Sequence, residues 1–364
     1  MNQNPKKSEK TLSIVAALVS VVIGLIAGWY LLFLTNATDS LAGLGMILFG
    51  GFTRSGGIGQ ILFTATPIIL TGLAVGFSFK TGLFNIGASG QLTVGAFTSI
   101  YIVVCATSIS PAFRLVLALI GGMAAGAAWG MISGALKAYF NVNEVISCIM
   151  LNYIAMFLVN MLIKNSAVYD SSYNRTVHLS DNVCVTTDLF NKIFPGSNIN
   201  FGIVFAVVAV VIIAIILDKT TLGYELKICG YNKDAGLYAG ISYSKSVIIS
   251  MAISGALAGL GGVLLVLSDY DMYLMVEETV LSYGFTGISV AMLGMSAPVG
   301  CLIAGLFIGV ITVGGSYLQL YGYTPDVVDM IIAIIVYCGA FALPLKILIQ
   351  KIHAGKQMKK GGDA

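Results

Sequence analysis

The sequence predicts an all-α, polytopic integral membrane protein. Hydrophobic residues make up 57% of the 364 residues and charged residues only 10%, whereas a soluble domain carries about 25% charged residues. The mean hydropathy is +0.93, and apolar runs long enough to cross the hydrocarbon core recur along the chain. The short alternating segments of a membrane β-barrel do not dominate. These observations favour a bundle of membrane-spanning helices.

About ten transmembrane helices are expected. The first apolar run follows Lys6, Lys7 and Lys10 and is longer than the core of a signal peptide, so we interpret it as a retained span. The segment 40–52 is too short to cross and is expected to be an interfacial or re-entrant helix on the outer side. The expected spans cover residues 12–34, 58–79, 84–106, 112–136, 144–163, 201–217, 246–267, 274–294, 297–317 and 326–345.

The distribution of basic residues predicts the orientation. With the N-terminus inside, 14 of the 19 Lys and Arg residues fall on the inner side and 5 on the outer side, as the positive-inside rule requires. An even number of spans also brings the C-terminus inside. We therefore expect a multi-pass protein of the cytoplasmic membrane with both termini in the cytoplasm.

The chain is expected to form one membrane domain over residues 1–364, because no Pro/Gly/Ser-rich linker divides it. Its long polar connections are an outer loop at 164–200 and an inner loop at 218–245. The halves 58–163 and 246–345 are candidates for an inverted repeat, since each holds a glycine-rich polar stretch beside long spans.

Several classes of chemistry are not indicated. The six cysteines are scattered without Cys-x-x-Cys spacing, and the two histidines lie far apart, so neither a metal site nor a cofactor is expected. The net charge of +3 is too small to indicate a nucleic-acid partner. No catalytic triad or phosphate-binding loop appears. We therefore expect that this chain is not an enzyme, and that any ATP that drives it is bound by another subunit.

Two stretches carry the functional signal. Asn85, Ser89 and Gln91 stand in an uncharged, glycine-rich stretch where a span begins. Their amides and hydroxyl either tie helices together or line a polar path. In the inner loop, Asn232 can cap a short helix that Gly240 ends in a left-handed conformation. This helix is either an ordinary membrane-surface segment or a contact for a partner.

Four blocks in register resemble the permease subunits of ABC importers for nucleosides and simple sugars, the branched-chain amino acid/ribose-type permease family. Within that family the long first span and extended outer loop are most similar to nucleoside (guanosine-type) permeases. Gly236 departs from the alanine usual there and costs about 1 kcal/mol of helix stability. The matching blocks are residues 82–96; Asn143, Glu144, Val145 and Ile146 with Leu151, Asn152 and Tyr153; Gly230, Asn232, Ala235, Tyr238, Ala239, Gly240 and Ile241; and 284–294, followed by Pro298 and Gly300.

The resemblance implies a path for nucleosides across the cytoplasmic membrane. The implied partners are cytoplasmic ABC ATPase subunits, a second permease that is identical or homologous, and an extracellular substrate-binding lipoprotein. A ribose-like sugar permease is the alternative within the family, and a stand-alone secondary carrier is the alternative outside it. The scarcity of acidic residues inside the spans argues against a proton-coupled carrier.

The resemblance also implies two sets of site residues. A neutral, hydroxyl-rich solute needs neutral donors and acceptors, because an unpaired buried charge is costly, and aromatic rings can stack on a base. The expected path residues are Phe84, Asn85, Ser89, Gln91, Asn152, Tyr283, Phe285 and Thr286. The residues expected to couple the permease to the ATPase are Asn232, Ala235, Leu237, Tyr238 and Gly240.

Overall fold

Helices make up most of the computed structural model, which describes residues 5–179, 185, 194–268, 273–341, 344–348 and 350. The all-α prediction is confirmed, since the one sheet found in this part of the chain has two strands of two residues each. The elements are α1 (Pro5–Thr35), α2 (Ser40–Thr53), α3 (Gly57–Lys80), α4 (Ala88–Cys105), α5 (Pro111–Phe140), α6 (Glu144–Lys164), β1 (Tyr169–Asp170), β2 (Arg175–Thr176), α8 (Gly202–Lys219), α9 (Thr221–Tyr231), α10 (Lys233–Tyr238), α11 (Tyr243–Val266), α12 (Tyr283–Leu293), α13 (Pro298–Ser316), η2 (Tyr317–Tyr321) and α14 (Pro325–Ala340).

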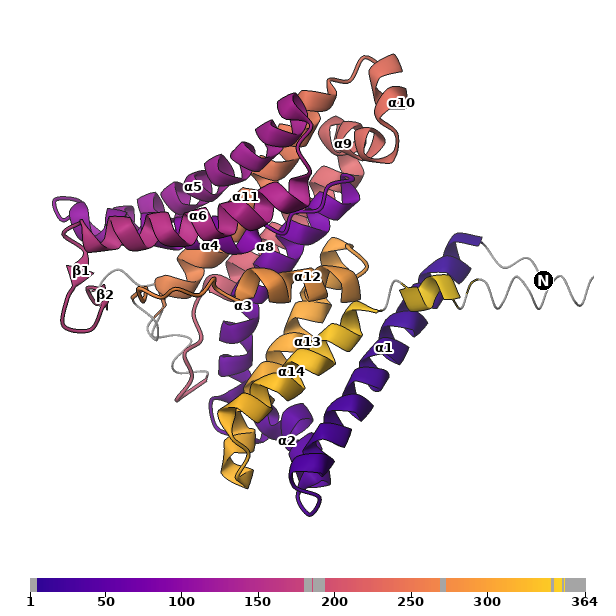
Figure 1. Ribbon diagram of the computed structural model, residues 1–364, viewed down its shortest axis with the longest axis vertical. Coiled ribbons are helices and arrows are strands. Elements are labelled where there is room, and N and C mark those ends of the chain that lie inside the picture. The colour runs from indigo at the N-terminus through magenta and orange to yellow at the C-terminus, as the bar shows by residue number, and fades with distance from the viewer. Residues whose placement is uncertain are drawn as a thin grey trace, which may run out of the picture.

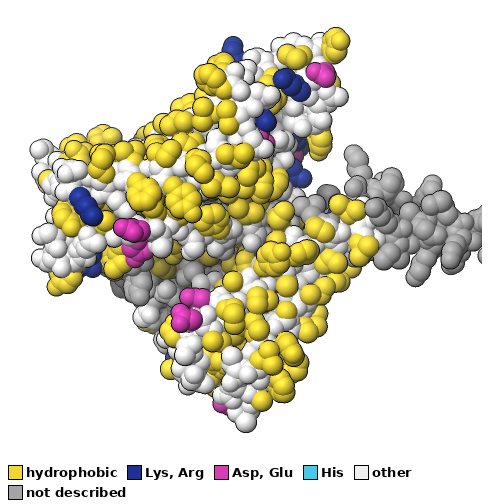
Figure 2. All heavy atoms as spheres, in the orientation of Figure 1, with side chains coloured by type: hydrophobic (Ala, Val, Ile, Leu, Met, Phe, Trp, Pro, Cys, Tyr) yellow, Lys and Arg dark blue, Asp and Glu magenta, His cyan; other side chains and the backbone are white. Residues whose placement is uncertain are grey.

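Within the described residues, nine helices are long and apolar enough to cross a membrane. The short helix expected at 40–52 is confirmed as α2. Large hydrophobic side chains remain exposed on α1, α6 and α8, and Figure 2 shows hydrophobic side chains over much of the visible surface. Lipid tails satisfy such a surface, so its exposure fits a membrane protein.

The prediction of an unbroken span at 274–294 is wrong. The helix of this region, α12, begins only at Tyr283. The residues before it bond instead to the β1–β2 hairpin: Thr176 N donates to Leu274 O (2.9 Å), and Leu274 N donates to Thr176 Oγ1 (2.9 Å). These partners satisfy backbone groups that a helix would otherwise pair internally, so the crossing is an irregular segment followed by a half-helix.

The span expected at 84–106 also begins later than predicted. Its helix, α4, begins at Ala88 because Asn85 Oδ1 accepts a hydrogen bond from Gly87 N (2.9 Å) and holds the preceding residues in a turn. Gly82, with φ of +75°, starts this turn in a conformation that favours glycine. The polar stretch is therefore irregular backbone that leads into a helix.

The helices form two groups on either side of α3. In Figure 1, α4, α5, α6 and α11 lie together, while α1, α2, α13 and α14 form the other group. Helix α3 packs against α11 of the first group and α13 of the second, and α12 packs against α3. Facing glycines, such as Gly126 and Gly255, let α5 and α11 approach closely.

The bundle has two distinct ends, which α3 connects. At one end Gly59 abuts Ser197, close to the hairpin segments, and at the other Gly82 abuts Gly230 of α9. We call these the hairpin end and the basic end. The basic end carries α9 and α10 together with Lys137, Lys227 and Lys233, and blue side chains gather around it in Figure 2.

Candidate functional site

A buried group of polar side chains lies where α3, α4, α6 and α11 meet. Asn85 Nδ2 donates to Gln91 Oε1 (2.8 Å), and Gln91 Nε2 donates back to Asn85 Oδ1 (3.2 Å). Asn85 Nδ2 also donates to Ser254 Oγ (2.7 Å), whose hydroxyl donates to Ala74 O (2.7 Å). Asn85 and Gln91 are 0% and 1% exposed. Every amide oxygen and nitrogen in this pair therefore has a partner, as buried amides require.

Asn152 of α6 extends this group. Its Oδ1 accepts from Gly90 N (2.8 Å), and its Nδ2 donates to Ile86 O (3.0 Å). One side chain thus satisfies backbone groups on both sides of the start of α4. We call Asn85, Gln91, Asn152 and Ser254 the amide cluster. In this conformation the cluster ties helices together, which is the first of the two interpretations open from the sequence.

The starts of two helices meet beside the cluster. Ser89, in the first turn of α4, lies against Gly284, in the first turn of α12, so closely that a Cβ on Gly284 would overlap Ser89. Ser89 Oγ is fully buried and has no hydrogen-bond partner among the described residues. Irregular backbone leads into both helices, the arrangement that transporters use where a solute or ion is bound.

A cavity of about 190 Å³ opens on the hairpin side of the cluster. We call it the outer cavity. Helix α4 contributes Thr93, α6 contributes Asn160, the segment before α12 contributes Tyr273 and Glu277, and α12 itself contributes Tyr283. Asn160 Nδ2 donates to Glu277 O (2.7 Å) and holds this segment over α6. A neighbouring cavity of about 440 Å³ shares Asn160 and is lined by Lys164 and Glu278.

A third cavity, of about 210 Å³, lies at the basic end. Gly82, Gly230, Lys233 and the ion pair between Lys137 Nζ and Glu144 Oε2 (2.9 Å) line it. We call it the inner cavity. Helix α11 contributes Tyr243, Ser246 and Val247 to the inner cavity and Leu265 and Val266 to the outer one. Along α6 and α11, Asn152 and Ser254 of the amide cluster lie between the residues that line the two cavities, and we call this line, together with the start of α4, the seam.

Of the remaining predicted path residues, only Tyr283 lines one of these three cavities, whereas Phe84, Phe285 and Thr286 line none of them. Phe84 packs against Phe79, with ring centroids 4.7 Å apart. Tyr283 lines the outer cavity, and its backbone oxygen accepts from Thr71 Oγ1 (3.0 Å). Phe285 is 46% exposed on α12, and Thr286 Oγ1 donates to Ser282 O (3.3 Å) within the same helix.

Sequence reasoning missed four polar residues of the seam. A serine or threonine inside an apolar helix is too common to single out, so Thr93 and Ser254 gave no distinct signal. Asn160 stood inside a predicted span and was a detectable polar position. Glu277 was noticeable as a carboxylate near the expected outer end of a span, but its cavity depends on the fold.

The predicted short helix of the inner loop is confirmed as α10. Asn232 Oδ1 accepts from Asp234 N (3.0 Å) and Ala235 N (3.2 Å), and Gly240 has φ of +77°. Ala235, Leu237 and Tyr238 are all exposed, and Tyr238 is 94% exposed. The helix stands at the tip of the basic end (Figure 1). Its apolar surface is therefore available to a partner.

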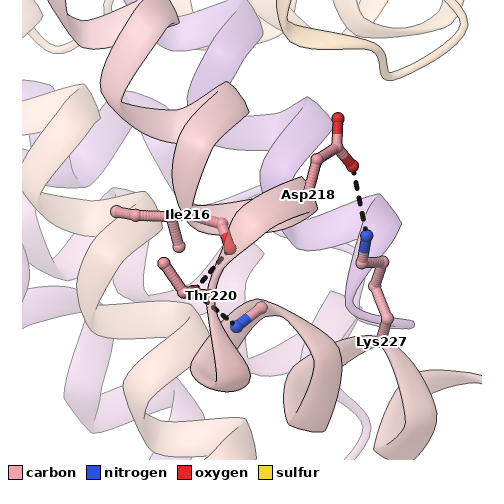
Figure 3. Close-up of polar contacts among 5 residues, drawn as sticks. Ile216, Asp218, Thr220 and Lys227 are labelled. Carbon is pink, nitrogen blue, oxygen red and sulfur yellow. Dashed lines mark hydrogen bonds and ion pairs between the residues drawn. The ribbon is translucent and has the colours of Figure 1, made fainter.

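The inner loop also contains a second helix, α9, which the sequence did not predict. Thr220 joins it to α8, as Figure 3 shows: its Oγ1 donates to Ile216 O (2.6 Å) and accepts from Gly223 N (3.1 Å). Lys227 Nζ bonds Asp218 Oδ1 at 3.3 Å across the same corner. One hydroxyl thus closes the end of a span and caps the next helix.

Glycines connect α10 and α9 to the amide cluster. Gly236 of α10 lies against Cys229, and a Cβ there would come within 3.0 Å of Cys229 Sγ. Gly230, which follows Cys229 in α9, meets the backbone of Thr81 and Gly82 and leaves no room there for a side chain. The close approach of Gly236 to Cys229 therefore offsets the lower helix propensity of glycine. Because Gly230 meets Thr81 and Gly82, α9 touches the turn that holds Asn85.

The amino-acid sequence is similar to those of known ABC transporter permeases. The chain is 34% identical to the nucleoside ABC transporter permease protein NupB of Lactococcus lactis subsp. cremoris (strain MG1363), over 98% of this chain and 99% of NupB. It is 37% identical to the guanosine ABC transporter permease protein NupP of Bacillus subtilis (strain 168), over 95% and 97% of the two chains. It is 31% identical to the glucose ABC transporter permease protein TsgB13 of Haloferax volcanii, over 87% and 84%.

The model of one protein family matches residues 57–339, the region that holds the amide cluster, both short inner helices and α12. Its description is the permease component of the branched-chain amino acid transport system. The match covers most of the described spans and agrees with the relatives, which are themselves ABC permeases. This chain is a multi-pass membrane protein that belongs to the family of branched-chain amino acid transport system permease components.

Proposed function

We propose that this chain is the permease subunit of an ABC importer that carries nucleosides across the cytoplasmic membrane. Two relatives that align over nearly the whole chain, at 34% and 37% identity, are nucleoside and guanosine permeases. The buried polar groups of the seam are neutral amides and hydroxyls. Such groups can exchange hydrogen bonds with a neutral solute without leaving a buried charge unpaired.

The solute path runs along the seam between α4, α6 and α11. The single observation that carries this proposal is the amide cluster, which lies between the residues that line the outer cavity and those that line the inner cavity. In the closed state, Asn85 and Gln91 satisfy each other. When the helices separate, these amides become free to bond the hydroxyls and base of the solute. Ser89 adds a hydroxyl that has no partner among the residues that the structure describes.

The basic end faces the cytoplasm in this proposal, because the topology expected from the sequence puts 14 of the 19 basic residues on the cytoplasmic side. Both termini are then cytoplasmic. Helix α10 docks into an ATPase subunit through Ala235, Leu237 and Tyr238, with Asn232 and Gly240 fixing its ends. ATP-driven movement of α10 reaches the turn around Asn85 through Gly230 and Gly82, whose backbones touch.

The complete importer needs further subunits. Two cytoplasmic ATPases supply the energy, and a second permease, identical or homologous, completes the membrane part. An extracellular binding lipoprotein delivers the solute to the hairpin end. Family membership and the exposed surface of α10 support this proposed assembly.

Sugar transport is the second candidate function. The observation that favours it is the 31% identity to a glucose permease. The cluster suits a sugar as well as a nucleoside, since both offer hydroxyl groups.

A competition assay distinguishes the two. The importer is assembled with its ATPase and binding protein in proteoliposomes, and uptake of labelled guanosine is measured. Other nucleosides are expected to compete and free ribose or glucose to compete weakly. Full competition by the sugars with none by nucleosides would replace the nucleoside proposal. Uptake that continues without ATP but collapses with the proton gradient would overturn the ABC mechanism.

A further inference from the structure

The mouth of the outer cavity holds a carboxylate that the proposed path does not yet use. Glu277 lines this cavity and is exposed. Its Oε2 accepts one hydrogen bond from Thr279 Oγ1 (3.2 Å). Among the described residues it forms no ion pair, because the pairs found there join Lys137 to Glu144 and Lys227 to Asp218. The carboxylate therefore keeps lone pairs for a ligand.

The backbone of Glu277 is held in place from two sides. Its carbonyl accepts from Asn160 Nδ2 (2.7 Å). The preceding Val276 N donates to Asn174 O (3.1 Å), and Asn174 Nδ2 donates to Val276 O (3.2 Å). The backbone that carries the carboxylate thus has a defined position beside the cavity, and Thr279 Oγ1 bonds the carboxylate itself. A positioned acceptor can select a ligand geometrically.

The rest of the cavity lining is mainly apolar. Met156, Val159 and Val266 line its wall, together with Tyr273 and Tyr283. Its volume of about 190 Å³ is smaller than the roughly 300 Å³ at which pockets for whole drug-sized ligands begin. The cavity therefore suits the base of a nucleoside, which leaves the ribose at the mouth beside Glu277.

We propose that Glu277 binds the ribose of the incoming nucleoside by accepting hydrogen bonds from its 2′- and 3′-hydroxyls. This role rests on the nucleoside function proposed above, and it assigns recognition of the ribose to the carboxylate of Glu277. Two adjacent hydroxyls match the two oxygens of a carboxylate, and such charge-assisted bonds are stronger than neutral ones. A site built around them rejects analogues that lack the hydroxyls, because its acceptor then stays unpaired.

The test combines a substitution with a change in the solute. Wild-type and Glu277→Gln importers, complete with ATPase and binding protein, are compared in proteoliposomes for uptake of guanosine, 2′-deoxyguanosine and 2′,3′-dideoxyguanosine. Each solute is compared with itself between the two permeases, so its affinity for the binding protein cancels. Glu277→Gln is expected to lower kcat/KM for guanosine about tenfold, for the deoxy compound less, and for the dideoxy compound less than about twofold.

The matched control is Glu278→Gln, because Glu278 is the neighbouring exposed carboxylate and lines the other cavity. It should leave the ratio between guanosine and dideoxyguanosine unchanged. Glu277→Asp keeps a carboxylate and should therefore retain part of the preference for guanosine over dideoxyguanosine. This variant provides a second measurement if Glu277→Gln assembles poorly.

The outcomes separate this inference from the function. An equal loss for all three solutes in Glu277→Gln, or no loss, would overturn the role of Glu277 while nucleoside transport stands. A wild-type importer that carries none of the three would overturn the nucleoside function itself, and the ribose contact with it. A loss that shrinks as hydroxyls are removed, seen at Glu277 and not at Glu278, supports the contact.

Discussion

Asn85 and Gln91 exchange two hydrogen bonds at the centre of the seam, Nδ2 to Oε1 at 2.8 Å and Nε2 to Oδ1 at 3.2 Å. The two residues stand on opposite sides of the helix start at Ala88. Their pairing closes the turn before α4, while Ser254 joins the pair to α11. The same atoms are thus both a structural tie and the polar groups that a solute would meet.

Asn85→Leu is expected to lower both uptake and stability. The substitution leaves Gln91 and Gly87 N without their partner, which costs about 1–3 kcal/mol in unfolding free energy, and it removes a donor and acceptor from the path. Uptake and thermal unfolding of the assembled complex measure the two effects. Thr98→Val is the control, because Thr98 bonds only Val94 O within its own helix. Unchanged guanosine uptake by Asn85→Leu would contradict the path assignment.

Gly230→Ala is expected to uncouple ATP hydrolysis from uptake. Its Cβ would overlap the backbone of Thr81 and Gly82, so α9 must move away from the turn that holds Asn85. ATPase activity should persist while uptake per ATP hydrolysed falls severalfold. Gly45→Ala provides the control, since a Cβ on Gly45 meets nothing within 4 Å. An unchanged ratio of uptake to ATP hydrolysis would show that the contact of Gly230 with Thr81 and Gly82 does not transmit movement from α9 to the turn that holds Asn85.

Ala235→Arg is expected to weaken association with the ATPase. It places a long charged side chain on the exposed surface of α10 beside Leu237 and Tyr238. Co-purification of the ATPase should fall while membrane insertion stays normal. Ala112→Arg makes the same change at an exposed site of α5 at the hairpin end and should have no such effect. Normal association and uptake in Ala235→Arg would rule out docking through this surface.

Thr220→Val is expected to loosen the corner between α8 and α9. The hydroxyl that bonds both Ile216 O and Gly223 N is lost, at a cost of about 1 kcal/mol. Hydrogen exchange at the first turn of α9 should accelerate, and Thr220→Ser should restore protection because it keeps the hydroxyl. Equal protection in the valine and wild-type proteins would mean that the cap is dispensable.

Cysteine labelling tests the orientation. In a background without native cysteines, Ser172→Cys at the exposed hairpin should react with an impermeant thiol reagent outside intact cells. Lys233→Cys should react only once the membrane is opened. Ser172 is a suitable position because it lies in the described part of the outer loop, whereas residues 180–184 and 186–193 lie outside the described residues. The reverse labelling pattern would invert the topology.

Local features of the chain were predictable from the sequence. Apolar length identified most of the spans, although not the broken one at 274–294. The cap at Asn232 and the left-handed Gly240 followed from residue types within one helical turn. The amides of the 82–95 stretch were recognised as buried polar groups, because a span without charge cannot leave them unpaired. Their partners, such as Asn152 on another helix, could only be listed as candidates.

What the sequence by itself determined was the class of the protein, the position of most helices and the family it resembles. The tertiary structure alone decided how the starts of α4 and α12 are held, since Asn85 bonds Ser254 of α11, and Leu274 bonds Thr176 on a distant hairpin. It alone brought Glu277 to a cavity and Gly230 to Gly82. Hydropathy and capping depend on neighbours along the chain, whereas these contacts join residues far apart in sequence and exist only once the helices have packed.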